Sequence, residues 1–358
     1  MSRSTTPATT LFTPPPVGQA GQVIQCPRGA CDIQHMTYDN TNVYFTTLIK
    51  TLETVMCSAV LVANVLLLLL LVVAHKRFAA VFFRILNVLV VIIVVRTLTT
   101  MIFKLPALWF NAAITSEANV TLIVDVIYKY LCILLIFLLS LNRFSVMVYP
   151  ALDQVLFSGK RYIYLCVISI VVSAAATYGV ITASNLRRLF DPKIGFIDYV
   201  DSATAYVASC AVFLLIATAS VCLHLTILFH LRCYRKRMTT IKSNKAEQKM
   251  LREISMISVI NMLFNILFVL LYIIPIPFNT RLVLVSVYNV LCSIPDVLIP
   301  LSVLIGSREV RLEIMDRFKT MIPSSRFSDT SIIKALREQY YTIVSLSNSL
   351  RVRTPVPV

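Results

Sequence analysis

Seven apolar runs, each long enough to cross a lipid bilayer, constrain this chain more than any other feature of its sequence. A helix rises about 1.5 Å per residue, so about 20 apolar residues span the roughly 30 Å hydrocarbon core. Membrane strands would instead need shorter segments of alternating polarity, which are absent here. The sequence therefore predicts an all-α integral membrane bundle of seven helices. The runs cover Thr54–Ala74, Ile85–Phe103, Val120–Leu141, Tyr162–Ala183, Ala203–Leu231, Ile254–Ile274 and Leu282–Ile305.

The composition agrees with an integral membrane protein. The chain has 358 residues, of which 58% are hydrophobic and 14% are charged. A soluble domain of this length could not bury so many apolar side chains. The net charge of +16 does not indicate nucleic acid, because Lys and Arg flank the apolar runs, where they contact anionic lipid. Membrane lipid is therefore an expected partner.

The distribution of Lys and Arg also predicts the orientation of the bundle. The loops on one side carry 14 of these residues and the loops on the other side carry 5. Cytoplasmic loops hold the excess in multi-pass proteins, so the N-terminus is predicted to lie outside. Asn119, in the sequence Asn119-Val120-Thr121, is the only N-glycosylation sequon and falls on the predicted outer side.

Three segments are expected along the chain: a flexible extracellular tail over residues 1–50, the bundle over 51–305, and a cytoplasmic segment over 306–358. The last segment should begin with a short amphipathic helix on the membrane face and continue as a Ser-rich tail. Phosphorylation of this tail would create a docking surface for an arrestin or a kinase, whereas a plain disordered tail is the alternative. Cys26 and Cys31 lie in the outer tail, where a disulfide and two free thiols are both compatible with the sequence.

Arg143 lies just after the third run, with Asn142 before it and Pro150 seven residues later. This pattern resembles the D-R-Y-x-x-(I/V)-x-x-P end of the third helix in rhodopsin-like G-protein-coupled receptors. The local sequence S-L-N-R-F-S-V is more similar to the nematode serpentine chemoreceptors, near their class gamma group. The resemblance implies a receptor in the plasma membrane of a sensory neuron, which binds an external small molecule and signals through a heterotrimeric G protein.

The resemblance assigns Arg143 to G-protein coupling. The alternative is an anchor whose side chain reaches the lipid headgroups on the cytoplasmic side. Asn142 stands where many rhodopsin-like receptors have an acid, so a charged lock between neighbouring residues cannot form. The third run also lacks a Cys at its outer end, which excludes the usual outer disulfide and favours a divergent chemoreceptor branch.

Asp125 is the principal candidate for ligand binding. It lies eighteen residues before Arg143, which is five helical turns, so both side chains should point the same way. In rhodopsin-like amine receptors an Asp at this separation holds the cation of the ligand. Here Lys129, one turn on, or Arg96 in the second run would instead neutralise the acid structurally. An amine is then disfavoured, and Lys129 or Arg96 would hold an acidic or polar ligand.

Asp296 lies within the seventh run, four residues before Pro300. It is also placed to meet Arg96, either as an ion pair that breaks on activation or as a static packing pair. Pro300 resembles the proline of the N-P-x-x-Y motif at the end of the seventh helix in rhodopsin-like receptors, although Ile299 and Val303 replace the Asn and the Tyr.

Two other classes of membrane protein remain as alternatives. A small-molecule transporter should show helices broken within the membrane and inverted repeats, which fits this sequence poorly. A seven-helix ligand-gated channel subunit would place its N-terminus inside, against the charge distribution. No catalytic triad, metal-ligand motif or phosphate-binding loop occurs, so no enzyme activity and no cofactor or metal are expected.

Overall fold

The computed structural model describes residues 43–74, 78, 80–110, 112–191, 195–235, 245–274, 278–306 and 310. The predicted outer tail up to residue 42, the two tail cysteines and nearly all of the predicted amphipathic helix and C-terminal tail lie outside these residues.

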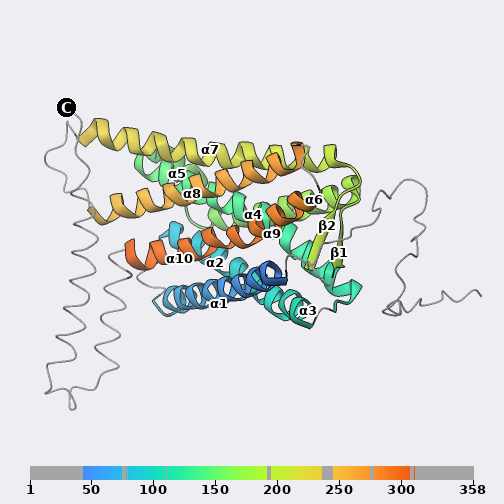
Figure 1. The fold of residues 1–358 in the computed structure, drawn as a ribbon. Coiled ribbons are helices and arrows are strands. Elements are labelled where there is room, and N and C mark those ends of the chain that lie inside the picture. The colour runs from blue at the N-terminus through green and yellow to red at the C-terminus, as the bar shows by residue number, and fades with distance from the viewer. Residues whose placement is uncertain are drawn as a thin grey trace, which may run out of the picture. The chain divides into compact units, whose positions relative to one another are not determined.

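Helices make up most of the described chain, and their order follows the predicted runs (Figure 1). They are α1 (Val43–Val73), α2 (Val81–Thr99), α3 (Leu105–Phe110), α4 (Thr115–Met147), α5 (Pro150–Leu156), α6 (Arg161–Ser184), α7 (Ala203–Arg235), α8 (Lys245–Ile273), α9 (Phe278–Leu291) and α10 (Ser293–Gly306). A π-helical segment, η2 (Thr100–Lys104), joins α2 to α3. Strands β1 (Arg187–Asp191) and β2 (Gly195–Tyr199) lie between α6 and α7.

Six helical segments among the described residues are long and apolar enough to span a membrane. They are Thr47–Val73, Val81–Phe110, Ser116–Met147, Arg161–Ser184, Ala203–Cys233 and Val283–Ile305. The remaining predicted run corresponds to the shorter apolar part of α8, Ser255–Leu271, which is about 26 Å long at 1.5 Å per residue. The helical membrane fold predicted from the sequence is thus confirmed, with its sixth span the shortest.

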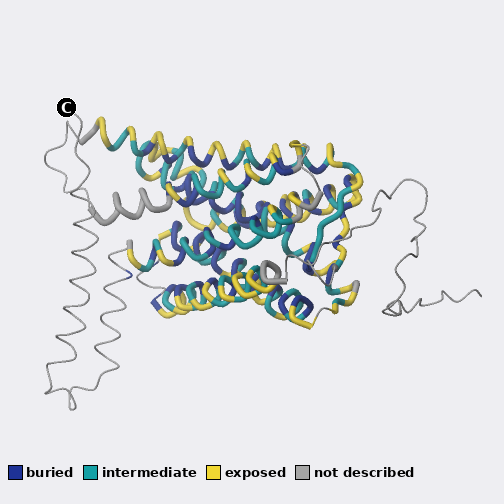
Figure 2. Tube along the Cα trace, in the orientation of Figure 1, coloured by how far each residue is buried: buried dark blue, intermediate teal, exposed yellow. Residues whose placement is uncertain are grey.

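Helix α4 lies at the centre of the bundle and packs against α2, α6 and α7. Helix α1 packs on α2 and α10, while α8 packs between α7 and α10. Buried residues line the sides that face other helices, and exposed residues line the outer sides (Figure 2). Large apolar side chains such as Val171, Leu215 and Phe229 are among the exposed ones. This arrangement suits a bundle surrounded by lipid, because the apolar side chains face the hydrocarbon while each helix bonds its own backbone groups.

A π-helical turn modifies the second span before its outer end. Pro106 has no backbone N–H, so the regular bonding pattern cannot continue through it. The N–H of Leu105 bonds to the carbonyl of Thr100, five residues back, as in a π-helix. The span then continues to Phe110, beyond its predicted end. Trp109 therefore lies on a helix, and its Nε1 donates a hydrogen bond to Thr54 Oγ1 at 3.2 Å.

The hairpin β1–β2 was not predicted from the sequence. Its antiparallel register sets Arg188 opposite Asp198 and Phe190 opposite Phe196. Gly195 has a φ of +93°, and a Cβ there would clash with Leu108 Cδ2 on α3. The hairpin also packs on the outer part of α4 through β1. It is thereby held over the end of the bundle at which α4 begins.

Candidate functional site

Five charged side chains form a continuous series of ion pairs at the hairpin end of the bundle. In order they are Asp198 on β2, Arg188 on β1, Asp125 on α4, Arg96 on α2 and Asp296 on α10, and together they are called the ion-pair chain below. Three carboxylates and two guanidinium groups give this chain a net charge of −1. It connects the hairpin to three helices that are far apart in the sequence.

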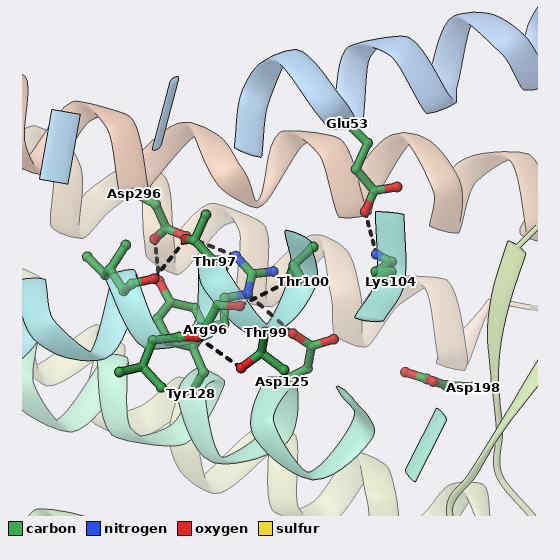
Figure 3. Close-up of polar contacts among 12 residues, drawn as sticks. Glu53, Arg96, Thr97, Thr99, Thr100, Lys104, Asp125, Tyr128, Asp198 and Asp296 are labelled. Atoms are coloured by element: carbon green, nitrogen blue, oxygen red, sulfur yellow. Dashed lines mark hydrogen bonds and ion pairs between the residues drawn. The ribbon is translucent and has the colours of Figure 1, made fainter. Parts of the chain in front are cut away.

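Arg96 holds two carboxylates at once, as Figure 3 shows. Its Nε lies 3.2 Å from Asp125 Oδ1 and its Nη1 lies 3.0 Å from Asp296 Oδ2. The guanidinium group also stacks over the ring of Tyr128, 4.8 Å from its centroid, and the Tyr128 hydroxyl donates to Asp296 Oδ1. Asp296 is only 2% exposed, so its charge depends on these partners. Both contacts that the sequence allows for Arg96 are thus present at once.

Asn64 ties α1 to the same point. Its Nδ2 donates to the backbone carbonyl of Asp296 at 2.9 Å and to the carbonyl of Val60 at 2.8 Å. Asn64 is fully buried, as expected of an amide that links two helices. The backbone of Asp296 is therefore held beside α1, while its side chain pairs with Arg96 on α2.

Arg188 forms the outer half of the ion-pair chain. Its Nη1 lies 2.7 Å from Asp125 Oδ2, and its Nε and Nη2 bond to the two carboxylate oxygens of Asp198 at 2.6 and 3.0 Å. A bidentate pair of this kind fixes the guanidinium plane. Burial lowers the pKa of Arg188, but the carboxylates of Asp198 and Asp125 outweigh burial and raise that pKa above its ordinary value. Arg188 thus remains charged, and Asp125 is shared between two guanidinium groups.

A separate ion pair links the first two spans near this end. Lys104 at the end of η2 lies 2.5 Å from Glu53 on α1, and both side chains are mostly buried. The pair is drawn beside the ion-pair chain in Figure 3. It leaves the Lys104 charge balanced and takes no part in the contacts of Arg96.

Lys129 does not contact Asp125, although it lies one turn further along α4. Its Nζ lies 3.3 Å from the centroid of the Phe268 ring on α8 and 4.0 Å from Cys210 Sγ on α7. Among the described residues, no carboxylate lies within ion-pair distance of this ammonium group. A desolvated cation–π contact contributes about 2 kcal/mol, whereas Lys at the centre of a membrane helix costs about 2.5–3.5 kcal/mol. The local contacts therefore offset only part of the cost of this charge.

An aromatic cluster surrounds the Lys129 contact. Phe268 lies 5.2 Å from Tyr288 on α9 and 5.8 Å from Tyr206 on α7, measured between ring centroids. Tyr130, next to Lys129 on α4, stacks on Phe213 at 4.0 Å and shares a hydrogen bond with Ser209. Lys129 thus lies where α4, α7 and α8 meet, against Phe268, whose ring contacts rings from α7 and α9.

Arg143, Asn142 and Pro300 lie away from the hairpin, towards the other end of the bundle. Arg143 stacks over Phe82 at 4.0 Å, and both Arg143 and Asp125 contact α2, as the five-turn separation predicts. Asn142 is buried, and its backbone carbonyl accepts a hydrogen bond from Ser145. Pro300 is buried within α10. A small hollow lies between α2, α4, α8 and α10, and Phe82 lines it.

Asn119 lies in the second turn of α4 and is exposed. The hydroxyl of Thr121, which completes the sequon, is buried and donates to the carbonyl of Ala118. Within the described residues, no group of three or more His, Cys, Asp or Glu side chains is arranged to hold a metal ion.

The structure thus joins Asp125, Arg96 and Asp296 in one network and separates Lys129 from them. Arg188, Asp198 and Tyr128 are not among the site residues predicted from the sequence. A signal for the first two was present: the segment R-R-L-F-D-P-K-I-G-F-I-D-Y alternates polar and apolar residues around a Pro and a Gly, which is typical of a hairpin. No comparable signal marked Tyr128, because its role depends on which residues α2 and α10 place opposite it.

A family model for the serpentine type 7TM GPCR chemoreceptor Srx matches residues 55–294, about two thirds of the chain. The matched segment runs from α1 into α10 and includes Arg143 and four members of the ion-pair chain, while Asp296 lies two residues beyond it. No curated protein matches the chain.

Proposed function

Because this chain belongs to the Srx family of serpentine seven-transmembrane chemoreceptors, we propose that it detects an external small molecule and signals through a heterotrimeric G protein. The receptor would act in the plasma membrane of a sensory neuron, with lipid around its apolar outer surface. An arrestin or a kinase would act on its C-terminal tail.

The ion-pair chain is the observation that carries this proposal. It begins on a hairpin at the predicted outer side and ends at Asp296 on α10, four residues before Pro300. A ligand that moves the hairpin or α4 changes the position of Asp125 and hence the hold of Arg96 on Asp296. Because Arg96 has two carboxylate partners, it can keep one while releasing the other, and such a pair of arrangements suits a two-state switch.

The inner end has features that fit G-protein coupling. Arg143 lies above the ring of Phe82, which also lines the hollow between α2, α4, α8 and α10. Outward movement of α8 would enlarge this hollow and uncover Arg143, so that a helix of the G protein could enter. Helix α8 begins at Lys245 in a basic stretch, which would complement an acidic partner surface.

Replacement of Arg143 tests the coupling role. Wild type and Arg143→Ala are expressed with an outer epitope in cells that report cAMP and calcium, and both are exposed to the same panel of small molecules. Arg143→Ala should reach the surface in wild-type amount, because it is partly exposed at a helix end, and lose the evoked response.

Arg84→Ala is the matched control. Arg84 is an exposed arginine near the same end of the bundle, and it too lies over an aromatic ring, that of Tyr162 at 5.4 Å. This control should respond like wild type. An unaltered response in Arg143→Ala at equal surface amount would remove Arg143 from the mechanism and leave it as a membrane anchor.

A further inference from the structure

Lys129 lies close to an aromatic ring, and no carboxylate among the described residues lies within ion-pair distance of it. Three other cations at this end form ion pairs with acids. Arg96 and Arg188 do so within the ion-pair chain, and Lys104 pairs with Glu53. The nearest acid along α4, Asp125, already accepts from two guanidinium groups. The acid one turn away on α4 is therefore already paired, and Lys129 forms no ion pair with it.

The position of Lys129 makes this imbalance unusual. It lies fourteen residues before Arg143 on α4, a distance of about 21 Å along the helix axis. This places the ammonium near the middle of the Ser116–Met147 span, where ionisable side chains normally face a partner or a pathway. Its present neighbours are a ring face and a thiol, which are both weak partners for an ammonium group.

We propose that the Lys129 ammonium group anchors the carboxylate of a small organic monoanion, whose apolar part packs among the rings of Tyr206, Phe268 and Tyr288. This inference rests on the proposed function and names the ligand class for it. A single ammonium group balances one negative charge, which favours a monocarboxylate over a phosphate. An amine would be repelled, because Lys129 would lie against it with no carboxylate between them.

Binding of this kind would also act on the bundle. The incoming carboxylate takes the place of the Phe268 ring face beside the Lys129 ammonium group, so the Phe268 side chain must move. Phe268 lies on α8 and touches rings from α7 and α9. Displacement of this ring therefore changes the packing of α8 against α7, and α8 is the helix whose inner part borders the hollow beside Phe82.

The test measures ligand binding by the purified full-length chain, without any G protein. The probes are benzoate, phenylacetate and butyrate, each compared with its uncharged amide, benzamide, phenylacetamide and butyramide, at constant ionic strength. Thermal unfolding is followed as each probe is added. At least one carboxylate should stabilise the wild-type protein with an apparent affinity about tenfold or more above that of its amide, as expected when a charge-assisted hydrogen bond is lost.

Three variants separate the charge from the shape of Lys129. Lys129→Met should bind the acid no better than the amide, Lys129→Arg should retain a preference for the acid, and Arg84→Ala should behave like wild type. Equal binding of acids and amides by the wild-type protein, or a preference for acids that survives in Lys129→Met, would overturn the assignment. The binding measurement needs no G protein, so a failure of coupling leaves it unaffected. A receptor that signals only in response to uncharged compounds would refute the carboxylate ligand but not the receptor function.

Discussion

Removal of Arg96 should destabilise the bundle through Asp296 rather than through Asp125. In Arg96→Leu, Asp125 keeps Arg188 at 2.7 Å, whereas Asp296 keeps only the Tyr128 hydroxyl and is 2% exposed. A buried carboxylate without a cation can lose its charge by taking up a proton. With an ordinary Asp pKa of about 3.9, that uptake costs about 4 kcal/mol at pH 7. This agrees with the roughly 3–5 kcal/mol lost when one partner of a buried pair is removed.

A double-mutant cycle isolates this effect. Asp296→Asn alone should be mild, because Arg96 retains Asp125 and the Tyr128 hydroxyl retains an acceptor. The double variant Arg96→Leu/Asp296→Asn should recover about 2 kcal/mol of the loss in Arg96→Leu, since it removes the unpaired charge. Thermal unfolding in detergent measures each variant, with Arg84→Leu as a control that should lie within about 0.5 kcal/mol of wild type.

The pH dependence gives an independent check. If Asp296 becomes protonated in Arg96→Leu, the penalty should fall from about 4 kcal/mol at pH 7 to roughly 1.5 kcal/mol at pH 5, because proton uptake costs about 1.4 kcal/mol less for each pH unit. The double variant has no such carboxylate and should show no additional dependence. A penalty that is independent of pH, or a double variant that loses the sum of the single losses, would refute the dependence of Asp296 on Arg96.

Two further changes test the hairpin and the orientation. Gly195→Ala should cost about 1–3 kcal/mol, because φ is +93° and the new Cβ would meet Leu108, and thermal unfolding together with the surface amount would measure the loss; an unchanged protein would show that the hairpin is not packed on α3. Treatment with an N-glycosidase should increase the gel mobility of the wild-type chain but not of Asn119→Gln, since Asn119 is the only sequon and is predicted to lie outside; a wild-type chain of unchanged mobility would count against glycosylation there.

The family and the membrane fold could be predicted from sequence because both depend on local patterns. A run of apolar residues must form a helix in lipid, whatever its neighbours are, since no water is available to its backbone groups. The stretch around Asn142, Arg143 and Pro150 carried the resemblance to serpentine chemoreceptors, and the match to the Srx family confirms it. The sequence placed the chain near the class gamma group, and the matching family is Srx.

Helix periodicity also determined which residues share a side of α4, but not what lies opposite. It placed Asp125 and Arg143 on one side, and both contact α2. It placed Lys129 one turn from Asp125, yet the two residues differ by about 40° around the helix axis at 100° per residue. That angle turns Lys129 towards α7 and α8, where Phe268 lies, while Asp125 faces α2 and the hairpin.

The partners of each charge were decided only by the tertiary structure. Arg188 and Asp198 face one another because the hairpin register pairs them, and they reach Asp125 because β1 packs on α4. Asp296 and Arg96 are two hundred residues apart in the chain. They meet because α1 packs on both α2 and α10. A single sequence fixes which side chains carry charge and how deep they lie in the membrane, but the balance of those charges depends on distances between helices, which arise only when the helices pack.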